Sequence, residues 1–310
     1  MLRFVLGRAL RGIITVWIVV TTVFVVLRLS GDPASAMLGP DAPPEAIDAF
    51  RARHDLDRSI PVQYVTYIGN ALRGDFGVSL ADRRPATEHF RRRIGATLEL
   101  GVVAVAIAVL VGIPAGVLAA LRRNSIWDRL AMGMAFIGQS APNFFIGVML
   151  ILVLSLQFNL FPSSGRGSWQ QLVMPAFTLA TGLLAALARM SRSALLEVVR
   201  QDFVRTARAK GLGERRVLLG HTLRNAAIPI VTLFGLSTGT LIGGAAITET
   251  VFAWPGVGRL TVNAVSSRDF PIIQLIVIVI AASVVTINLL IDIAYGLLDP
   301  RIRATGRGGA

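Results

Sequence analysis

The chain alternates between long hydrophobic runs and shorter stretches that are rich in charged residues. A helix needs about 20 residues to cross the hydrocarbon core of a bilayer, so each run of that length predicts a membrane span. Six runs qualify, and together they predict an all-α membrane protein with six transmembrane helices. The predicted spans are Ala9–Leu29, Leu98–Leu121, Met132–Phe158, Leu172–Ala188, Ile228–Phe252 and Ile272–Leu298.

The longest polar stretch, Ser30–Ala96, follows the first span and carries charges of both signs. Pro44, Pro61 and Gly74 interrupt it, and such residues favour several short helices over a single long one. The stretch therefore predicts a small helical subdomain outside the membrane. Its predicted helices include Glu45–Arg53 and Val62–Leu72.

Basic residues are concentrated in alternate short loops, and such loops usually face the cytoplasm. The other short loops hold only Arg166 in one case and Arg259 and Arg268 in the other. This asymmetry predicts that both termini are cytoplasmic. The basic residues on the predicted cytoplasmic side are Arg3, Arg8, Arg11, Arg122, Arg123, Arg129, Arg189, Arg192, Arg200, Arg205, Arg208, Lys210, Arg215, Arg216, Arg224, Arg301, Arg303 and Arg307.

The spans and loops divide the chain into four predicted segments. Residues 1–29 form a cytoplasmic N-terminus with the first transmembrane helix, and residues 30–96 form the extracytoplasmic subdomain. Residues 97–300 form the core transmembrane domain, which includes a cytoplasmic loop at residues 190–227. Residues 301–310 form a cytoplasmic tail.

The N-terminus has a second interpretation, because an Arg-rich flank, an apolar run and Ala34-Ser35-Ala36 also fit a cleaved signal peptide. However, the apolar run is long enough to span a membrane. Cleavage would also leave five spans, with the new N-terminus on the wrong side. We therefore expect the first span to be retained.

The composition fits a membrane protein, since 54% of the residues are hydrophobic, 16% are charged and mean hydropathy is +0.65. A formal net charge of +13 would indicate nucleic acid binding in a soluble protein. Here the basic residues lie between the spans, so they indicate topology, and no nucleic acid partner is expected. The chain has no cysteine, which excludes disulfides, thiol nucleophiles and thiolate metal sites.

The sequence contains no G-x-x-x-x-G-K-S/T phosphate loop, no H-E-x-x-H, and no cluster of His and carboxylates at metal-ligand spacing. Gly256-Val257-Gly258 is a glycine-rich fragment, which we interpret as a tight turn at the membrane surface. We therefore expect no catalytic residue, and no cofactor or metal bound by this chain.

Few ionisable residues fall inside the predicted spans, where a charge is costly unless it is paired or functional. The candidates are Glu99, Glu249 and Asp292. Glu99 and Glu249 are predicted near the outer ends of their helices, where water can reach them. Asp292 follows Asn288 by one helical turn, which suits either a polar contact between helices or a role in a transport pathway. An ion-coupled carrier would need more buried charges.

Small residues repeat at every fourth position of the fifth span, at Gly235, Gly239 and Gly243. Gly112 and Gly116 form a similar pair around Pro114 in the second span. Such stripes allow helix backbones to approach closely. They indicate either packing within the chain or, for the fifth span, contact with a partner subunit along a pathway.

The loop from Met190 to Ala227 is amphipathic and long, and loops of this length are usually functional. Its first part places Leu195, Val198, Val199 and Phe203 on one side. A break at 211–213 separates this part from a second amphipathic piece. Two short helices with a glycine joint would suit either docking to another protein or contact with anionic lipid.

Asp202–Leu212, followed by His221–Pro229, resembles the cytoplasmic loop of permeases in binding-protein-dependent ABC importers, specifically the dipeptide/oligopeptide/nickel type. In that family the loop docks in a groove of the ATPase subunit. The general form has Glu-Ala-Ala before a spaced glycine, whereas this chain has Arg205-Thr206-Ala207 and keeps Gly211. The residues that the resemblance assigns to coupling are Phe203, Arg205, Thr206, Ala207, Arg208, Ala209, Lys210, Gly211 and Leu212.

The resemblance extends over nearly the whole chain, and the long outer segment is similar to that of the first of the two paired permeases. The further matching motifs are Gly31-Asp32-Pro33, Gly74-Asp75-Phe76-Gly77 with Ser79, Ala141-Pro142-Asn143-Phe144, Thr248–Phe252, Pro255–Leu260, Arg268-Asp269-Phe270-Pro271, Asn288–Asp292, Tyr295 and Asp299-Pro300-Arg301.

The resemblance implies a multi-pass permease subunit of an ATP-driven importer in the bacterial inner membrane. It would form half of a pathway for di- or oligopeptides, and the alternatives are nickel or glutathione import, or an ion-coupled carrier. The implied partners are a second permease, two ATPase subunits that bind ATP and Mg, a solute-binding protein and the lipid bilayer. Candidate pathway or gate residues are Glu249, Asn288, Asp292, Gly239 and Gly243.

Overall fold

A computed structural model gives the fold. It describes the backbone of residues 2–29, 31, 33–39, 42–53 and 55–298, and the side chains of these residues except 2–5, 33, 36, 37, 219, 221, 228, 236, 238–240, 242 and 290–298. Within this described part every regular element is helical, and Val78 and Pro85 form one isolated β-bridge. The predicted all-α fold class is therefore confirmed.

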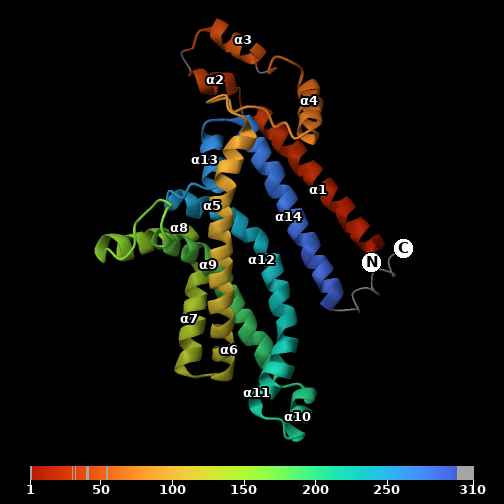
Figure 1. Ribbon diagram of the computed structural model, residues 1–310, viewed down its shortest axis with the longest axis vertical. Helices are drawn as coiled ribbons and strands as arrows, with labels where there is room; N and C mark the ends of the chain where they lie inside the picture. Colours follow the sequence, from red (N-terminus) through yellow and green to blue (C-terminus); the bar gives the residue numbers. More distant parts are fainter. Residues whose placement is uncertain (1, 30, 32, 40–41, 54, 299–310) are drawn as a thin grey trace. The chain divides into compact units, whose positions relative to one another are not determined.

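The chain forms two compact units. The terminal unit comprises Met1–Thr97 and Pro255–Ala310, and the central unit comprises Leu98–Trp254. In the terminal unit, α1 (Leu2–Leu29) packs along α14 (Phe270–Leu298), as Figure 1 shows. The terminal unit also contains α2 (Pro33–Leu38), α3 (Pro44–Arg53), α4 (Ile60–Leu72) and α13 (Val257–Ser266). The predicted short helices after the first span are thus confirmed.

Aromatic residues attach α4 to α1. Pro61 lies in the first turn of α4. N–H groups at this position have no partner within the helix, so the proline costs no hydrogen bond. Phe24 of α1 is only 1% exposed, and it contacts the rings of Tyr64 and Tyr67 at centroid distances of 5.2 and 5.6 Å. The Tyr64 hydroxyl also hydrogen-bonds Thr21 of α1 at 2.6 Å. The helical segment after the first predicted span is therefore packed against the end of that span.

Two sequence motifs that lie far apart in the chain meet in the terminal unit. The Ser79 hydroxyl donates to Oδ2 of Asp269 at 2.5 Å, and the Leu80 N–H donates to Oδ1 at 3.3 Å. Asp269 is only 2% exposed, and Phe76 packs against the apolar cluster that contains Phe270. The loop after α4 is thereby fixed to the turn between α13 and α14.

The central unit is built around α9 (Trp169–Val198), which packs against α6 (Ile113–Leu121), α7 (Ile126–Ser140), α8 (Asn143–Leu150) and α12 (Leu223–Val251). A side chain at Gly112 would lie 2.7 Å from the Leu184 carbonyl oxygen of α9, and one at Gly116 would overlap the Ala188 carbonyl. These two glycines therefore serve packing within the chain.

The second predicted span is one long helical run. α5 (Ala86–Ile107) continues through the π-helical segment η1 (Ala108–Gly112) into α6. The run begins at Ala86, inside the stretch predicted to be extracytoplasmic. The irregularity expected around Pro114 takes the form of η1, which immediately precedes the proline-containing turn.

The third predicted span, Met132–Phe158, is not a single helix. α7 ends at Ser140, and the chain bends by 110° between α7 and α8. α8 then continues into the π-helical η2 (Ile151–Gln157). Ala141 adopts an extended conformation (φ −82°, ψ 132°), as expected for a residue that precedes proline. The hydropathy of this region is continuous, so the pattern alone did not indicate the bend.

Among the described residues, four helices are long and apolar enough to cross a membrane: Leu6–Leu29, Ala86–Leu121, Trp169–Val198 and Phe270–Leu289. The bent pair α7 and α8 with η2 would be a fifth span if it crosses as one. The predicted fourth span is longer than expected, because α9 continues past Ala188 to Val198. The predicted fifth span lies in α12, several of whose side chains fall outside the described residues.

Candidate functional site

We define the coupling segment as residues 190–227, which connect α9 to α12. The segment contains the end of α9, α10 (Asp202–Ala209), α11 (Glu214–Arg216), the π-helical η3 (Val217–Thr222) and the start of α12. Figure 1 shows α10 and α11 together at one end of the central unit, beside the end of α12. The expectation of two short helices thus needs a correction, since residues 190–198 belong to α9.

The inner face of α10 is firmly packed. Val204 and Ala207 are 0% and 6% exposed, and their spacing of three residues places them on one helical face. They share an apolar cluster with Leu195 of α9, Val217 of η3 and Ala226 of α12. α10 is therefore packed against residues of both long helices.

Phe203 lies at the exposed edge of the packed face of α10. The sequence pattern placed Phe203 on the same side as Leu195 and Val198, and this expectation is wrong, because Phe203 is 37% exposed whereas the other two are buried. The chain turns at residues 199–201, where Gln201 is extended (ψ 151°). The 3.6-residue periodicity of α9 therefore does not predict which residues of α10 are buried. An exposed aromatic ring among arginines is typical of a protein interface.

The end of α10 is capped by a Schellman motif. Gly211 has a φ of +77°, its N–H donates to the Arg208 carbonyl at 2.9 Å, and the Leu212 N–H donates to the Ala207 carbonyl at 3.4 Å. Leu212 packs on the same apolar cluster as Ala207. Within the proposed motif, Gly211 and Leu212 therefore shape the turn.

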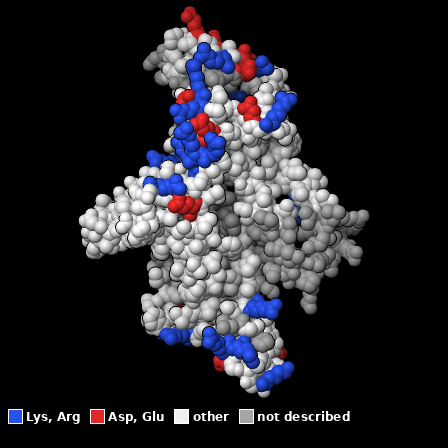
Figure 2. All heavy atoms as spheres, viewed as in Figure 1, with Lys and Arg blue, Asp and Glu red and all other residues white. Residues whose placement is uncertain are grey.

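The arginines of α10 have different surroundings. Arg208 binds Glu214 through two contacts, Nε to Oε1 at 2.7 Å and Nη2 to Oε2 at 3.3 Å, which connect α10 to α11. Arg205 lies 3.5 Å from Asp202, and its side chain is 78% exposed. Figure 2 shows that the surface at this end of the central unit is mainly positive. Arg205 is thus the more available of the two for a partner, together with the exposed Thr206, Ala209 and Lys210.

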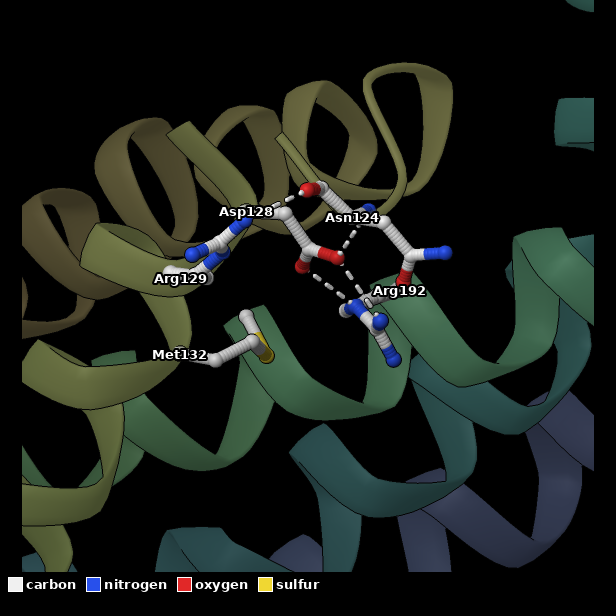
Figure 3. Close-up of a pocket in the computed structure, with 5 residues that line it drawn as sticks. All are labelled: Asn124, Asp128, Arg129, Met132 and Arg192. Atoms are coloured by element: carbon white, nitrogen blue, oxygen red, sulfur yellow. Dashed lines mark hydrogen bonds and ion pairs between the residues drawn. The ribbon is translucent and has the colours of Figure 1, made fainter. Parts of the chain in front are cut away.

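A second interaction fixes α7 to α9 at the start of the coupling segment (Figure 3). Asp128 of α7 is 4% exposed, and its carboxylate accepts from Arg192 Nε at 2.7 Å and Nη2 at 2.9 Å. The Asn124 N–H donates to the same carboxylate at 2.9 Å. A bidentate pair of this kind fixes orientation as well as distance.

This ion pair was missed by the sequence reasoning, which counted Arg192 among the topology signals. Asp128 occupies the third position of α7, after the N-cap Ser125, whose hydroxyl accepts from the Asp128 N–H. An acidic residue three positions after an N-cap serine is typical of a helix start, and this one lies in an otherwise basic loop. That pattern could have identified Asp128 as a structural residue. No local pattern identified Arg192 as its partner.

Because an L-residue other than Asn rarely adopts a positive φ, Gly211→Ala is expected to destabilise the turn by about 1 kcal/mol. The added methyl group meets no atom within 4 Å, so the effect is purely conformational. Thermal unfolding of the purified chain measures it. Gly213→Ala is the control, since Gly213 has a φ of −62° and equal space. Gly211→Asn should lower the stability less than Gly211→Ala does. An equal loss of stability in both variants would contradict the assignment of the cap.

The candidate pathway residues are divided between the two units, with Glu249, Gly239 and Gly243 in the central unit and Asn288 and Asp292 in the terminal unit. Glu249 is fully buried near the end of α12, so its predicted contact with water is wrong in this structure. Glu99 does lie at an exposed position, where Arg166 donates to its carboxylate at 2.6 and 2.8 Å. Asn288 is exposed on α14. Gly239 and Asp292 lie outside the residues whose side chains the structure describes.

Gly243, which belongs to the predicted glycine stripe of α12, and the adjacent Gly244 have different surroundings. A side chain at Gly243 would meet no atom within 4 Å, whereas one at Gly244 would lie 3.2 Å from Asn143 Nδ2 and 3.3 Å from Leu179. Gly244 therefore packs within the central unit, and Gly243 leaves an open surface. Among the described residues, no group of three or more His, Cys, Asp or Glu side chains could hold a metal ion.

Comparison with known proteins identifies two matching families. Residues 112–304 match the family described as binding-protein-dependent transport system inner membrane component, and residues 1–101 match the N-terminal region of such membrane components. The chain is 42% identical over 337 residues to the dipeptide transport system permease protein DppB of Escherichia coli (strain K12), covering 98% of this chain and 99% of DppB. It is 41% identical over 304 residues to the glutathione transport system permease protein GsiC of the same strain, with the same coverage.

Solved structures show the same fold. An inward-facing conformation of the MetNI methionine ABC transporter superposes with a TM-score of 0.58 at 21% identity, covering 69% of this chain and 97% of that one. An amino acid ABC transporter with histidines superposes with a TM-score of 0.52 at 20% identity, covering 69% and 94%.

Proposed function

This chain belongs to the family of binding-protein-dependent transport system inner membrane components, and from that premise we propose that it forms half of the translocation pathway of an ATP-driven peptide importer. Membership in the family makes it a multi-pass permease subunit of the bacterial inner membrane. Dipeptides or oligopeptides are the proposed cargo, since DppB, a dipeptide permease by name, matches over almost the whole length.

The proposed topology has six spans with both termini in the cytoplasm. It is supported by the four long apolar helices, by the bent pair α7 and α8, and by the 29-residue length of α12. The arginines of the coupling segment then face the cytoplasm, in agreement with the positive-inside rule. The segments proposed from the sequence, residues 30–96 outside and 190–227 inside, keep these locations.

The chain itself is proposed to be non-catalytic. Two ATPase subunits would bind ATP and Mg and contact the coupling segment, a second permease would complete the pathway, and a solute-binding protein would deliver peptide from outside. Gly243 supports contact with the second permease, because a small residue on an open helix face allows close approach. Glu249, Asn288, Asp292 and Gly239 remain proposed pathway or gate residues.

The observation that carries this mechanism is the construction of the coupling segment. α10 exposes Phe203 and Arg205, while its Val204 and Ala207 share an apolar cluster with residues of α9 and α12. A partner can shift a conformational equilibrium only through contacts that differ between the two states. A rigid contact helix packed on two membrane helices can pass such a difference to the pathway.

Reconstitution of the complete transporter in proteoliposomes tests this function. We expect uptake of a labelled dipeptide that requires ATP, the ATPase subunits and the solute-binding protein, and no uptake by this chain alone. A parallel measurement with radiolabelled glutathione tests the second candidate cargo, which the similar match to GsiC favours. Uphill transport by the isolated chain without nucleotide hydrolysis would overturn the proposal.

Charge reversal at Arg208 is expected to reduce ATP-dependent uptake because it breaks the contacts with Glu214 and frees α10 from α11. The exchange variant Arg208→Glu with Glu214→Arg should recover most of the lost uptake, since it restores the pair with opposite polarity. Arg205→Glu should reduce uptake without recovery by Asp202→Arg, because its proposed role is contact with a partner. Recovery in both exchange variants would assign Arg205 a role within the chain only.

A further inference from the structure

A small, partly open cavity lies in the terminal unit, between α1, α4, α14 and the loop that follows α4. Its volume is about 260 Å³, and its lining includes Leu80 of this loop and Phe270 and Pro271 of α14. Three side chains in its wall carry buried polar atoms that have no hydrogen-bond partner among the described residues. These side chains are Arg28, Gln63 and Gln274.

Arg28 supplies a positive charge to the cavity. Its guanidinium lies 5.2 Å from the centre of the Phe24 ring and 5.4 Å from that of Phe270, and these rings restrict its orientation. Its Nε atom is buried and unpartnered within the described part of the chain. A partly desolvated cation is costly unless an anion or several hydrogen-bond acceptors approach it.

Two glutamine side chains contribute the other unpartnered polar atoms of the wall. Gln274 of α14 is 8% exposed, and its Nε2 has no acceptor among the described residues. The Gln63 amide nitrogen donates to the carbonyls of Leu56 at 3.2 Å and Arg58 at 2.6 Å, so its Oε1 is fixed as an acceptor. That oxygen is likewise buried and unpartnered. The side chains of the wall thus carry two donors and one acceptor that have no partner in the described part of the chain, and buried groups of this kind are usually hydrogen-bonded.

The other ionisable groups in the wall leave this positive charge in place. Asp55 pairs with Arg58 at 3.0 Å, and both side chains are more than half exposed, so their charges compensate each other in water. Tyr67 also lines the cavity. Burial, and next the neighbouring Tyr64, raise the pKa of Tyr67, so its hydroxyl is protonated and can donate.

We propose that this cavity binds a small ligand with a carboxylate next to an N–H donor, the chemistry shared by free amino acids and the C-terminal end of short peptides. The carboxylate would accept from Arg28 and Gln274, and the N–H would donate to Gln63 Oε1. Guanidinium groups bind carboxylates strongly and with defined geometry. The role of the site rests on the proposed function, because in the proposed topology the cavity lies on the outer side, where peptide arrives.

Calorimetric titration of the full chain in lipid nanodiscs tests the site with L-alanyl-L-alanine, its C-terminal amide and L-alanine. We expect the amide to bind about tenfold or more weakly than the free acid. Arg28→Met, which keeps the apolar stem between the two rings, should weaken binding of the acid by a similar factor and abolish the difference between acid and amide. Arg73→Met is the control, since Arg73 is exposed and lies outside the cavity lining, and it should change binding less than twofold. Equal binding of L-alanine would identify a free amino acid as sufficient.

Gln274→Leu provides a second test if Arg28→Met does not fold, and we expect severalfold weaker binding of the free acid with an unchanged unfolding temperature. Equal affinities for acid and amide in the wild-type chain, or no binding of either, would overturn the site. ATP-dependent uptake of the same dipeptide by the complete transporter is measured separately. Uptake without acid-selective binding overturns the cavity alone, whereas Arg28-dependent binding without any peptide uptake overturns the proposed function alone.

Discussion

Substitution of Gly116 by leucine is expected to prevent the central unit from folding. Any side chain at this position overlaps the Ala188 carbonyl of α9 and approaches Ser191 Cβ to 2.8 Å. Backbone atoms cannot move aside as the end of a flexible side chain can. Even Gly116→Ala should therefore lower the free energy of unfolding by about 2 kcal/mol or more. Detergent-solubilised protein analysed by size exclusion and thermal unfolding measures both effects.

Gly101 provides the matched control, because it lies in the same helical run and a side chain there meets no atom within 4 Å. Alanine favours helix by about 1 kcal/mol over glycine, so Gly101→Ala should be neutral or stabilising. The two alanine variants are thus expected to differ in sign. A similar response of both would show that α6 and α9 do not pack as closely as described.

Substitution of Asp128 by alanine is expected to lower stability by about 2–3 kcal/mol and to reduce ATP-dependent uptake. The variant leaves Arg192, whose side chain is only 25% exposed, without its carboxylate. It also removes the acceptor for the Asn124 N–H. Because Arg192 lies two turns before the end of α9, loosening this position should weaken the transfer of motion from the coupling segment.

The double variant Asp128→Ala with Arg192→Met separates a buried charge from a structural requirement. Removing both charges should recover most of the lost stability, as replacing buried ion pairs by apolar residues often does. Asp202→Ala is the control carboxylate, since Asp202 is 95% exposed in its pair with Arg205 and should change stability by less than about 0.5 kcal/mol. If Asp202→Ala were as damaging as Asp128→Ala, burial would not explain the effect.

The features that could be predicted from the sequence are those that depend on local pattern. Hydrophobic length identified α1, the run from α5 to α6, and α14, because a helix in lipid must be apolar along its whole length. Proline and glycine positions identified α3 and α4 within one or two residues. The turn at Gly211 followed from its place between two amphipathic pieces.

The features that were missed depend on contacts between distant residues or on a local change of direction. Asp128 and Arg192 are 64 residues apart, and Ser79 and Asp269 are 190 apart, so no periodicity links the partners. Phe203 was assigned to the wrong face because a single helical phase was extended through the turn at 199–201. The bend before α8 was missed because the hydropathy does not change where Pro142 redirects the chain.

The length of α9 has a mechanical consequence. Its 30 residues extend over about 45 Å, whereas the hydrocarbon core is about 30 Å thick. The helix thus exceeds the hydrocarbon core by about ten residues, and in the proposed topology its end with Arg192 projects into the cytoplasm. Pro175, the proline inside the helix, is in its second turn, at the far end. A push delivered at the cytoplasmic end should consequently tilt α9 as a whole, with any flexing confined to the neighbourhood of Pro175.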